Sequence, residues 1–181
     1  MATVPQRAPA DLGTPVDAAE RELAAACLDA DGEHFDWQAV DARLAEAGDE
    51  PLAVYRALLQ STNAALKLRF LSGAKVDDLL AERTLFVDKI IVAAADRLLG
   101  KLRGKIALVA VGGYGRSELH PGSDIDLMLL SNRNLNRERD NVAAYFAFLW
   151  DIGLELGPST RTVAECKSAA KNDLTIATTL M

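Results

Sequence analysis

Cysteine, histidine and long apolar runs are all scarce in this chain of 181 residues. The two cysteines, Cys27 and Cys166, lie far apart in the sequence and neither belongs to a Cys-x-x-Cys pair, which argues against a zinc site or a disulfide framework. No apolar run approaches the roughly 20 residues that a membrane-spanning helix needs. Residues 1–16 lack the basic start and apolar core of a secretory signal. We therefore expect a protein of the reducing cytoplasm with no membrane partner.

Positive charge is also in short supply. The chain has 20 Lys and Arg against 26 Asp and Glu, a formal net charge of −6. Broad nucleic-acid binding requires a basic face that neutralises phosphates, so we expect no nucleic-acid partner. Hydrophobic residues make up 50% of the chain and charged residues 25%, a balance typical of a globular protein with one sizeable core.

The first fifty residues carry no chemical motif. Residues 1–16 are rich in proline and poor in apolar side chains, and we interpret them as a disordered tail. Residues 17–50 predict a helical extension with short helices over 17–31 and 36–47. We expect this extension to be solvated, and we assign it no function.

Two longer amphipathic helices are expected over 51–71 and 76–99. Apolar residues recur in both at helical spacing, and a glycine follows each. Pro51 suits the first turn of a helix. We predict that both apolar stripes, including Phe70 near the end of the first, belong to the core.

The stretch from 106 to 130 is the most informative part of the chain. An apolar run over 106–111 predicts a buried strand, and Gly112 and Gly113 follow at once. A short polar segment then has room for about one or two helical turns. After a Pro-Gly turn comes a second apolar run, which carries Asp124 and Asp126 at its start.

This pattern predicts a site for a metal and a phosphate. Side chains at positions i and i+2 of a strand point to the same face, about 6–7 Å apart, so Asp124 and Asp126 should project together. Mg²⁺ is usually held by one or two carboxylates together with substrate phosphates. Gly112 and Gly113 have no side chains and let a phosphate approach the N–H groups that open the short helix.

Two other phosphate motifs fit poorly. The chain has no Gly-x-x-x-x-Gly-Lys-Ser/Thr segment, which excludes a P-loop. The run over 113–118 begins as Gly-x-Gly but ends in Glu118 rather than glycine, which disfavours a dinucleotide-binding fold.

The remainder of the chain predicts further elements around this pattern. We expect a helix over 137–150, a third strand over 154–161, and a helix to about residue 171 that opens with a capping box at Thr162 and Glu165. The helix over 137–150 is expected to turn these side chains inward: Val142, Tyr145, Phe146, Leu149 and Trp150. A last helix over 173–181 has no stop signal, which suggests that the chain is truncated.

These residues resemble a known family. An apolar residue, Gly-Gly and a following Asp-x-Asp are the motif of the nucleotidyltransferase superfamily that includes DNA polymerase beta. The run over 112–127 is similar to the N-terminal transferase domain of the bacterial PII uridylyltransferase/uridylyl-removing enzymes. The resemblance extends over about 55–181, through 149–157, Arg161-Thr162 and 173–178.

The resemblance implies metal-dependent transfer of UMP from UTP to a tyrosine hydroxyl of the PII signalling protein, with two Mg²⁺ ions and release of pyrophosphate. Asp124 and Asp126 would be the catalytic and metal-binding residues. The residues expected to bind the triphosphate are Gly112, Gly113, Arg116 and Ser117.

Three questions stay open at this point. The superfamily's third carboxylate is Glu155, Asp151 or a residue beyond Met181. The alternatives to a uridylyltransferase are a related adenylyltransferase and a non-catalytic module that binds a nucleotide or a protein. Enzymes of the family are several times longer than this chain, so residues 51–181 would be an incomplete transferase domain.

For the fold we predict an α+β nucleotidyltransferase architecture. Its small mixed sheet has strands over 106–111, 125–130 and 154–161. Helices flank this sheet, and the N-terminal helical segment precedes it.

Overall fold

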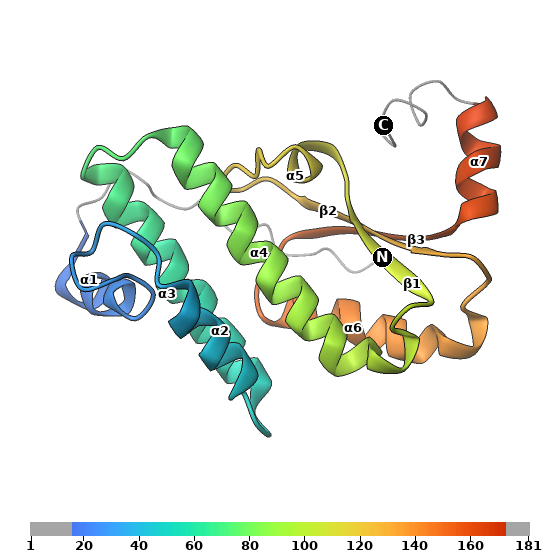
Figure 1. Cartoon of the computed structure of the whole chain (residues 1–181), viewed down its shortest axis with the longest axis horizontal. Coiled ribbons are helices and arrows are strands. Elements are labelled where there is room, and N and C mark those ends of the chain that lie inside the picture. The colour runs from blue at the N-terminus through green and yellow to red at the C-terminus, as the bar shows by residue number, and fades with distance from the viewer. Residues whose placement is uncertain (1–15, 173–181) are drawn as a thin grey trace, which may run out of the picture.

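The computed structural model describes residues 16–172 and confirms the α+β fold, with helices packed around a three-stranded mixed sheet (Figure 1). The tail expected up to residue 16 and the helix expected over 173–181 lie outside the described residues, except for Val16. The Val16 side chain is buried, so the packed part of the chain includes the last residue of the predicted tail.

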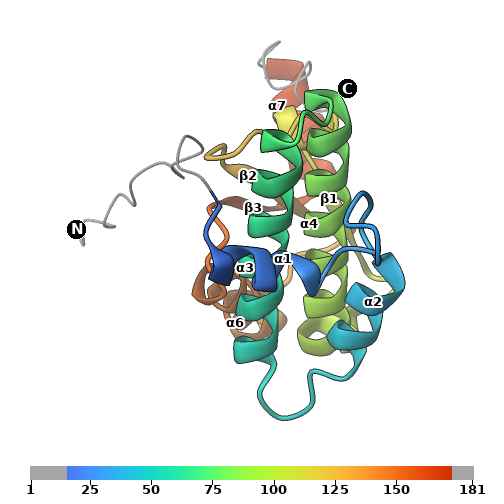
Figure 2. The ribbon, with the colours of Figure 1, turned by 90° about the vertical axis from the view of Figure 1, so that its left-hand side faces the viewer.

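The N-terminal segment is part of the main core. Its helices, α1 (Ala18–Ala25) and α2 (Trp37–Ala45), are shorter than predicted. Asp17 caps α1 by accepting the N–H of Glu20 at 2.8 Å, and the Glu20 carboxylate accepts the N–H of Asp17 at 3.2 Å. Figure 2 shows α1 against α3, and the buried side chains of this segment belong to the same apolar cluster as those of the later helices: Ala24, Cys27, Leu28, Phe35, Val40, Leu44 and Ala47. The segment is therefore packed on one side rather than solvated throughout.

The two long helices, α3 (Pro51–Leu71) and α4 (Val76–Leu99), have the predicted bounds. They bury most of their apolar stripes, but Phe70 is 44% exposed, so its prediction as a core residue is wrong. The neighbouring Arg69 is buried instead, paired with Glu82 and lying over the ring of Phe35. Arg69 takes the inward position, and Phe70 is turned to solvent.

A short 3₁₀ turn (Gly100–Leu102) leads into the sheet. Its strands are β1 (Ile106–Ala110), β2 (Ile125–Ser131) and β3 (Leu156–Thr162), in the order β1-β2-β3. Strand β1 runs antiparallel to β2, and β3 runs parallel to β2. Parallel neighbours need a crossover connection, which is made here by a 3₁₀ turn (Asn136–Glu138) and α6 (Arg139–Asp151).

Helix α6 packs on the sheet through one stripe. Val142, Tyr145, Phe146 and Leu149 are buried as predicted, whereas Trp150 is 50% exposed. The prediction that Trp150 points inward is therefore wrong. Successive residues of a helix are rotated by about 100°, so the residue after Leu149 falls outside the buried stripe.

The two faces of the sheet differ. Ile125, Leu127 and Leu129 alternate along β2 and join the core with α4 and α6. The other face is partly covered by α7 (Val163–Asn172), whose Cys166 sulfur lies 4.0 Å from the sulfur of Met128. Figure 1 shows α7 and α6 on opposite sides of the sheet.

The predicted capping box opens α7. The N–H of Glu165 donates to Thr162 Oγ1 at 3.2 Å, and the N–H of Thr162 donates to the Glu165 carboxylate at 2.7 Å. None of the helices within residues 16–172 is long and apolar enough to cross a membrane.

Candidate functional site

The centre of the site is the carboxylate of Asp126, at the second position of β2. A Cβ atom placed on Gly112 would lie 2.8 Å from Asp126 Oδ2, and one placed on Gly157 would lie 2.7 Å from Asp126 Oδ1. Both distances are too short for real Cβ atoms, so the carboxylate fits only because both positions are glycine. Gly112 also has a φ of +62°, a conformation that L side chains rarely adopt.

Gly157 was not predicted as a site residue. It is the register partner of Asp126 on β3, and paired residues of parallel strands share a face. A glycine within a strand often marks a close approach of another group. That signal was present in the predicted third strand, but the sequence did not show which residue approaches.

The glycine turn that follows β1 is joined to β2 by a hydrogen bond from the N–H of Val111 to the carbonyl of Asp126, at 3.0 Å. The turn continues as the four-residue helix α5 (Gly112–Gly115). Among the described residues, no hydrogen bond outside the helices and strands is donated by the N–H of Gly112 or Gly113. Of these two predicted phosphate-binding residues, Gly112 lies directly beside the Asp126 carboxylate and Gly113 is the next residue of the turn. The N–H groups of both are suited to an anion.

Two further contacts fix α5, and neither was predicted. A Cβ on Gly115 would lie 2.7 Å from the carbonyl oxygen of Ala110, so the helix packs directly on the end of β1. The buried Tyr114 donates its hydroxyl hydrogen to the carboxylate of Asp88 on α4. Burial and the Asp88 carboxylate both raise the pKa of Tyr114, so the phenol stays protonated and remains a donor.

Asp124 lies one residue before β2. It is exposed, as is Asp126, whereas Ile125 between them is buried in the core. The alternation predicted from the sequence is therefore present, and it turns neither carboxylate into the apolar cluster.

Arg116 and Ser117 follow α5 and are both exposed. Arg116 Nε donates to the Glu118 carboxylate at 2.9 Å, so Glu118 competes with any phosphate for this side chain. Ser117 has a φ of 60°, which is uncommon outside glycine, and its N–H donates to the carbonyl of Tyr114 at 3.1 Å. Both predicted residues are thus part of the turn that leaves the glycines.

The two candidates for a third carboxylate do not join this pair. Within the described chain, no group of three or more His, Cys, Asp or Glu side chains is placed to hold a metal ion. The Asp151 carbonyl accepts Arg56 Nε at 2.7 Å, and the Glu155 carbonyl accepts the N–H of Ile125 at 2.7 Å. The pKa of Arg83 on α4 is lowered, chiefly because the side chain is buried. The negative charge of Glu155 partly offsets this shift.

The donor set fits Mg²⁺ better than a transition metal. It consists of carboxylate oxygens, with neither thiolate nor imidazole among them, and Mg²⁺ prefers oxygen and takes its remaining ligands from water and phosphate. The Asp126 carboxylate beside the glycine turn, with the exposed Asp124 two residues before it, is compatible with a metal-bound polyphosphate.

Comparison with known proteins confirms the predicted resemblance. Residues 89–175 match the model of the nucleotidyltransferase domain family. The chain is 44% identical over 141 residues to a bifunctional uridylyltransferase/uridylyl-removing enzyme of Nitrosococcus oceani. It is 43% identical over 153 residues to the enzyme of the same name from Stutzerimonas stutzeri, and 43% identical over 152 residues to that of Pseudomonas fluorescens.

These matches cover 77–83% of this chain but only 16–17% of the relatives. The chain thus spans a small part of the length of the curated relatives it matches. No solved structure matches it.

Proposed function

We propose that the segment over residues 89–175, which matches the nucleotidyltransferase domain family, transfers UMP from UTP to a tyrosine hydroxyl of a PII signalling protein in the cytoplasm. The relatives carry the name uridylyltransferase, which supports UTP as the donor. The observation that carries the proposal is the Asp126 carboxylate held between the backbones of Gly112 and Gly157, next to a turn suited to phosphates.

The residues of this chain have separate tasks in that reaction. Gly112 and Gly113 bind the β- and γ-phosphates through their N–H groups. Asp124 and Asp126 would hold Mg²⁺, which neutralises charge on the phosphates and lowers the pKa of an attacking hydroxyl. Arg116 adds positive charge when it exchanges Glu118 for a phosphate, and Ser117 adds a hydroxyl contact.

The transfer forms one bond and breaks another. The tyrosine oxygen of the acceptor bonds to the α-phosphorus of UTP, and the bond between that phosphorus and the bridging oxygen breaks. Pyrophosphate leaves on the side of Gly112 and Gly113. The phenolic proton is lost to solvent or to a carboxylate of the site.

A direct test is pyrophosphate release from UTP, measured with PII protein present and with Mg²⁺ added or withheld. We expect release that needs both Mg²⁺ and the acceptor, and we expect Asp124→Asn to abolish it. Turnover that survives Asp124→Asn would remove this residue from the mechanism, and release without an acceptor would contradict transfer to PII.

The shortage of carboxylates favours a second candidate. Because no third acidic group joins Asp124 and Asp126 in the described chain, the domain also fits a module that binds a nucleotide without turnover. Mg²⁺-dependent UTP binding with no pyrophosphate release, also with PII present, would favour the module. A preference for ATP over UTP would instead indicate a related adenylyltransferase.

A further inference from the structure

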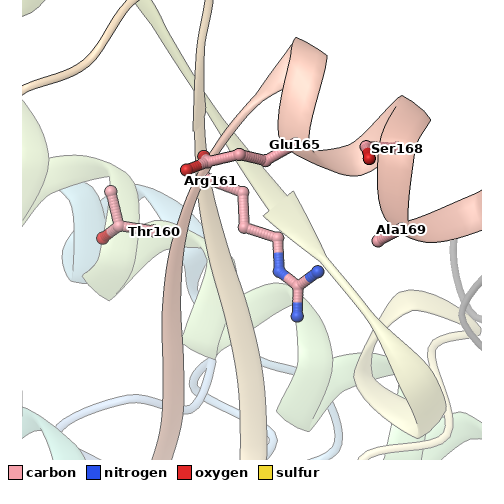
Figure 3. Close-up of a pocket in the computed structure, with 5 residues that line it drawn as sticks. All are labelled: Thr160, Arg161, Glu165, Ser168 and Ala169. Carbon is pink, nitrogen blue, oxygen red and sulfur yellow. The ribbon is translucent and has the colours of Figure 1, made fainter.

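A hollow lies on the side of the sheet that carries Asp126. It has a volume of about 440 Å³ and opens between β3 and α7. Figure 3 shows the residues that line it: Thr160, Arg161, Glu165, Ser168 and Ala169. Arg161 belongs to a stretch that carries the family resemblance, and it is not among the residues of the site around Asp126.

The register of the sheet connects this hollow to the site. Asp126 pairs with Gly157, Met128 with Ser159, and Leu130 with Arg161. Side chains of paired residues in parallel strands share a face, and alternate residues of one strand share a face too. Arg161 therefore belongs to the face of Asp126, four residues further along the strands, or about 13 Å at the usual rise per residue. Helix α7 lies over the same face, as the contact of Cys166 with Met128 shows.

The guanidinium of Arg161 donates no hydrogen bond and forms no ion pair in the part of the chain that the structure describes, although its positive charge contributes to lowering the pKa of Glu165. The nearby Glu165 carboxylate is occupied, because it accepts both the N–H and the hydroxyl of Thr162, at 2.7 and 2.8 Å. Figure 3 shows the guanidinium turned away from that carboxylate. Arg69, Arg116 and Arg133, by contrast, each have a carboxylate partner.

A half-buried guanidinium that donates no hydrogen bond within the described chain is available to donate to a ligand that supplies an acceptor. Arginine offers only hydrogen-bond donors, in a fixed planar arrangement. The hollow is therefore suited to a flat group that presents oxygen acceptors.

We propose that Arg161 selects the base of the donor nucleotide by hydrogen bonding to a carbonyl oxygen of uracil. This inference rests on the proposed function, which places the triphosphate at Gly112 and Gly113 and the α-phosphate at Asp126. The nucleoside then extends along the Asp126 side of the sheet toward α7 and the hollow. Uracil presents a carbonyl where cytosine presents an amino group, and an amino donor facing the Arg161 donors is repelled.

The test measures dissociation constants for UTP, CTP and ATP in the presence of Mg²⁺, by calorimetry on the whole chain. We expect Arg161→Gln to weaken UTP binding about tenfold, the scale of one hydrogen bond from a charged donor, and to change CTP binding less than twofold. The preference for UTP over CTP then falls about tenfold. Arg161→Lys keeps the charge without the planar donor pair, so its preference for UTP over CTP should lie between those of the unmodified chain and Arg161→Gln.

Lys167→Gln is the matched control, because Lys167 is an exposed cation of α7, the helix that borders the hollow. It should leave all three constants within twofold, and thermal unfolding of each variant checks that the fold is intact. Equal weakening of UTP, CTP and ATP by Arg161→Gln would overturn the inference by assigning Arg161 to the phosphates. An unchanged ratio of UTP to CTP would also overturn it while leaving the proposed function intact. Failure of the unmodified chain to bind any nucleotide with Mg²⁺ would overturn both.

Discussion

The helical half of the molecule and the glycine-rich half use opposite kinds of contact. In α1 to α4, bulky apolar side chains fill the interior, and charged side chains pair across helices, as Lys67 does with Glu20 and Lys89 with Asp41. Around Asp126, the close contacts are made by backbone atoms and a carboxylate, and they exist because side chains are missing at Gly112, Gly115 and Gly157.

The difference predicts how each half responds to mutation. A core of apolar side chains loses stability when a side chain is shortened. A site whose close contacts require glycine is distorted when a single methyl group is added at one of those glycines. The helical half should therefore report mainly on folding, and the glycine-rich half mainly on activity.

The largest effect is expected when a carboxylate of the site loses its charge. Asp126→Asn keeps the shape of the side chain but removes the charge that would hold Mg²⁺, so transfer should fall about 10³-fold with little change in the unfolding temperature. Steady-state pyrophosphate release measures this. Asp96→Asn removes an exposed carboxylate of α4 and should be silent, and equal losses in both variants would contradict a local role for Asp126.

The core of the helical half should give the opposite result. Leu58 of α3 is 1% exposed, and Leu58→Ala should lower the free energy of unfolding by about 3 kcal/mol. Activity per folded molecule should stay near that of the unmodified chain. Urea denaturation monitored by circular dichroism measures the free energy of unfolding. A large loss of activity in fully folded Leu58→Ala protein would contradict the proposed difference between the halves.

A methyl group added at Gly157 tests the contact with Asp126. The new Cβ in Gly157→Ala would meet Asp126 Oδ1 at 2.7 Å, so the carboxylate must rotate away, and we expect about a 30-fold loss of transfer. Gly100→Ala is the control, because a Cβ there meets nothing within 4 Å and the φ of Gly100 is not positive. Comparable activity in the two variants would show that the position of the Asp126 carboxylate is not critical.

The smallest effect is expected from loss of the hydrogen bond between Tyr114 of α5 and Asp88 of α4. Tyr114→Phe leaves the Asp88 carboxylate without its donor and should cost about 1 kcal/mol at neutral pH. The folded pKa of Tyr114 lies above its unfolded value of about 10, so the stabilisation is complete below about pH 10 and is lost as the pH rises further.

Unfolding curves between about pH 8 and 11 check this sign. The unmodified chain should lose more stability than Tyr114→Phe over that range. Burial also raises the pKa of Tyr145, but Tyr145 is present in both proteins, so its contribution cancels. Parallel pH profiles would contradict the assignment to Tyr114.

Much of the fold could be predicted because local signals mark it. Pro51 at the first turn of α3 and the glycines that follow α3 and α4 gave the helix bounds to the residue. Alternation placed Ile125 inside and Asp126 outside. The exposed Phe70 and Trp150 were misassigned because helical spacing alone does not show where the partner surface ends.

The remainder of the site depends on which backbone meets which side chain in space. Gly157 lies 31 positions from Asp126 in the sequence, and the hydrogen bond between Tyr114 and Asp88 spans 26 positions. Neither contact has a local signature that names its partner. The roles of all six predicted site residues remain predictions that activity has to test: Asp124, Asp126, Gly112, Gly113, Arg116 and Ser117.

The place of β2 between two other strands has an evolutionary meaning. Asp126 is fixed from both sides, by the glycine turn after β1 and by Gly157 of β3, so we expect most changes in its surroundings to displace the carboxylate. The far end of β3 and the first turns of α7 touch neither the acid nor that turn. If Arg161 selects the base, descendants of this domain can acquire a new donor nucleotide by substitutions there, while the reacting centre is inherited unchanged.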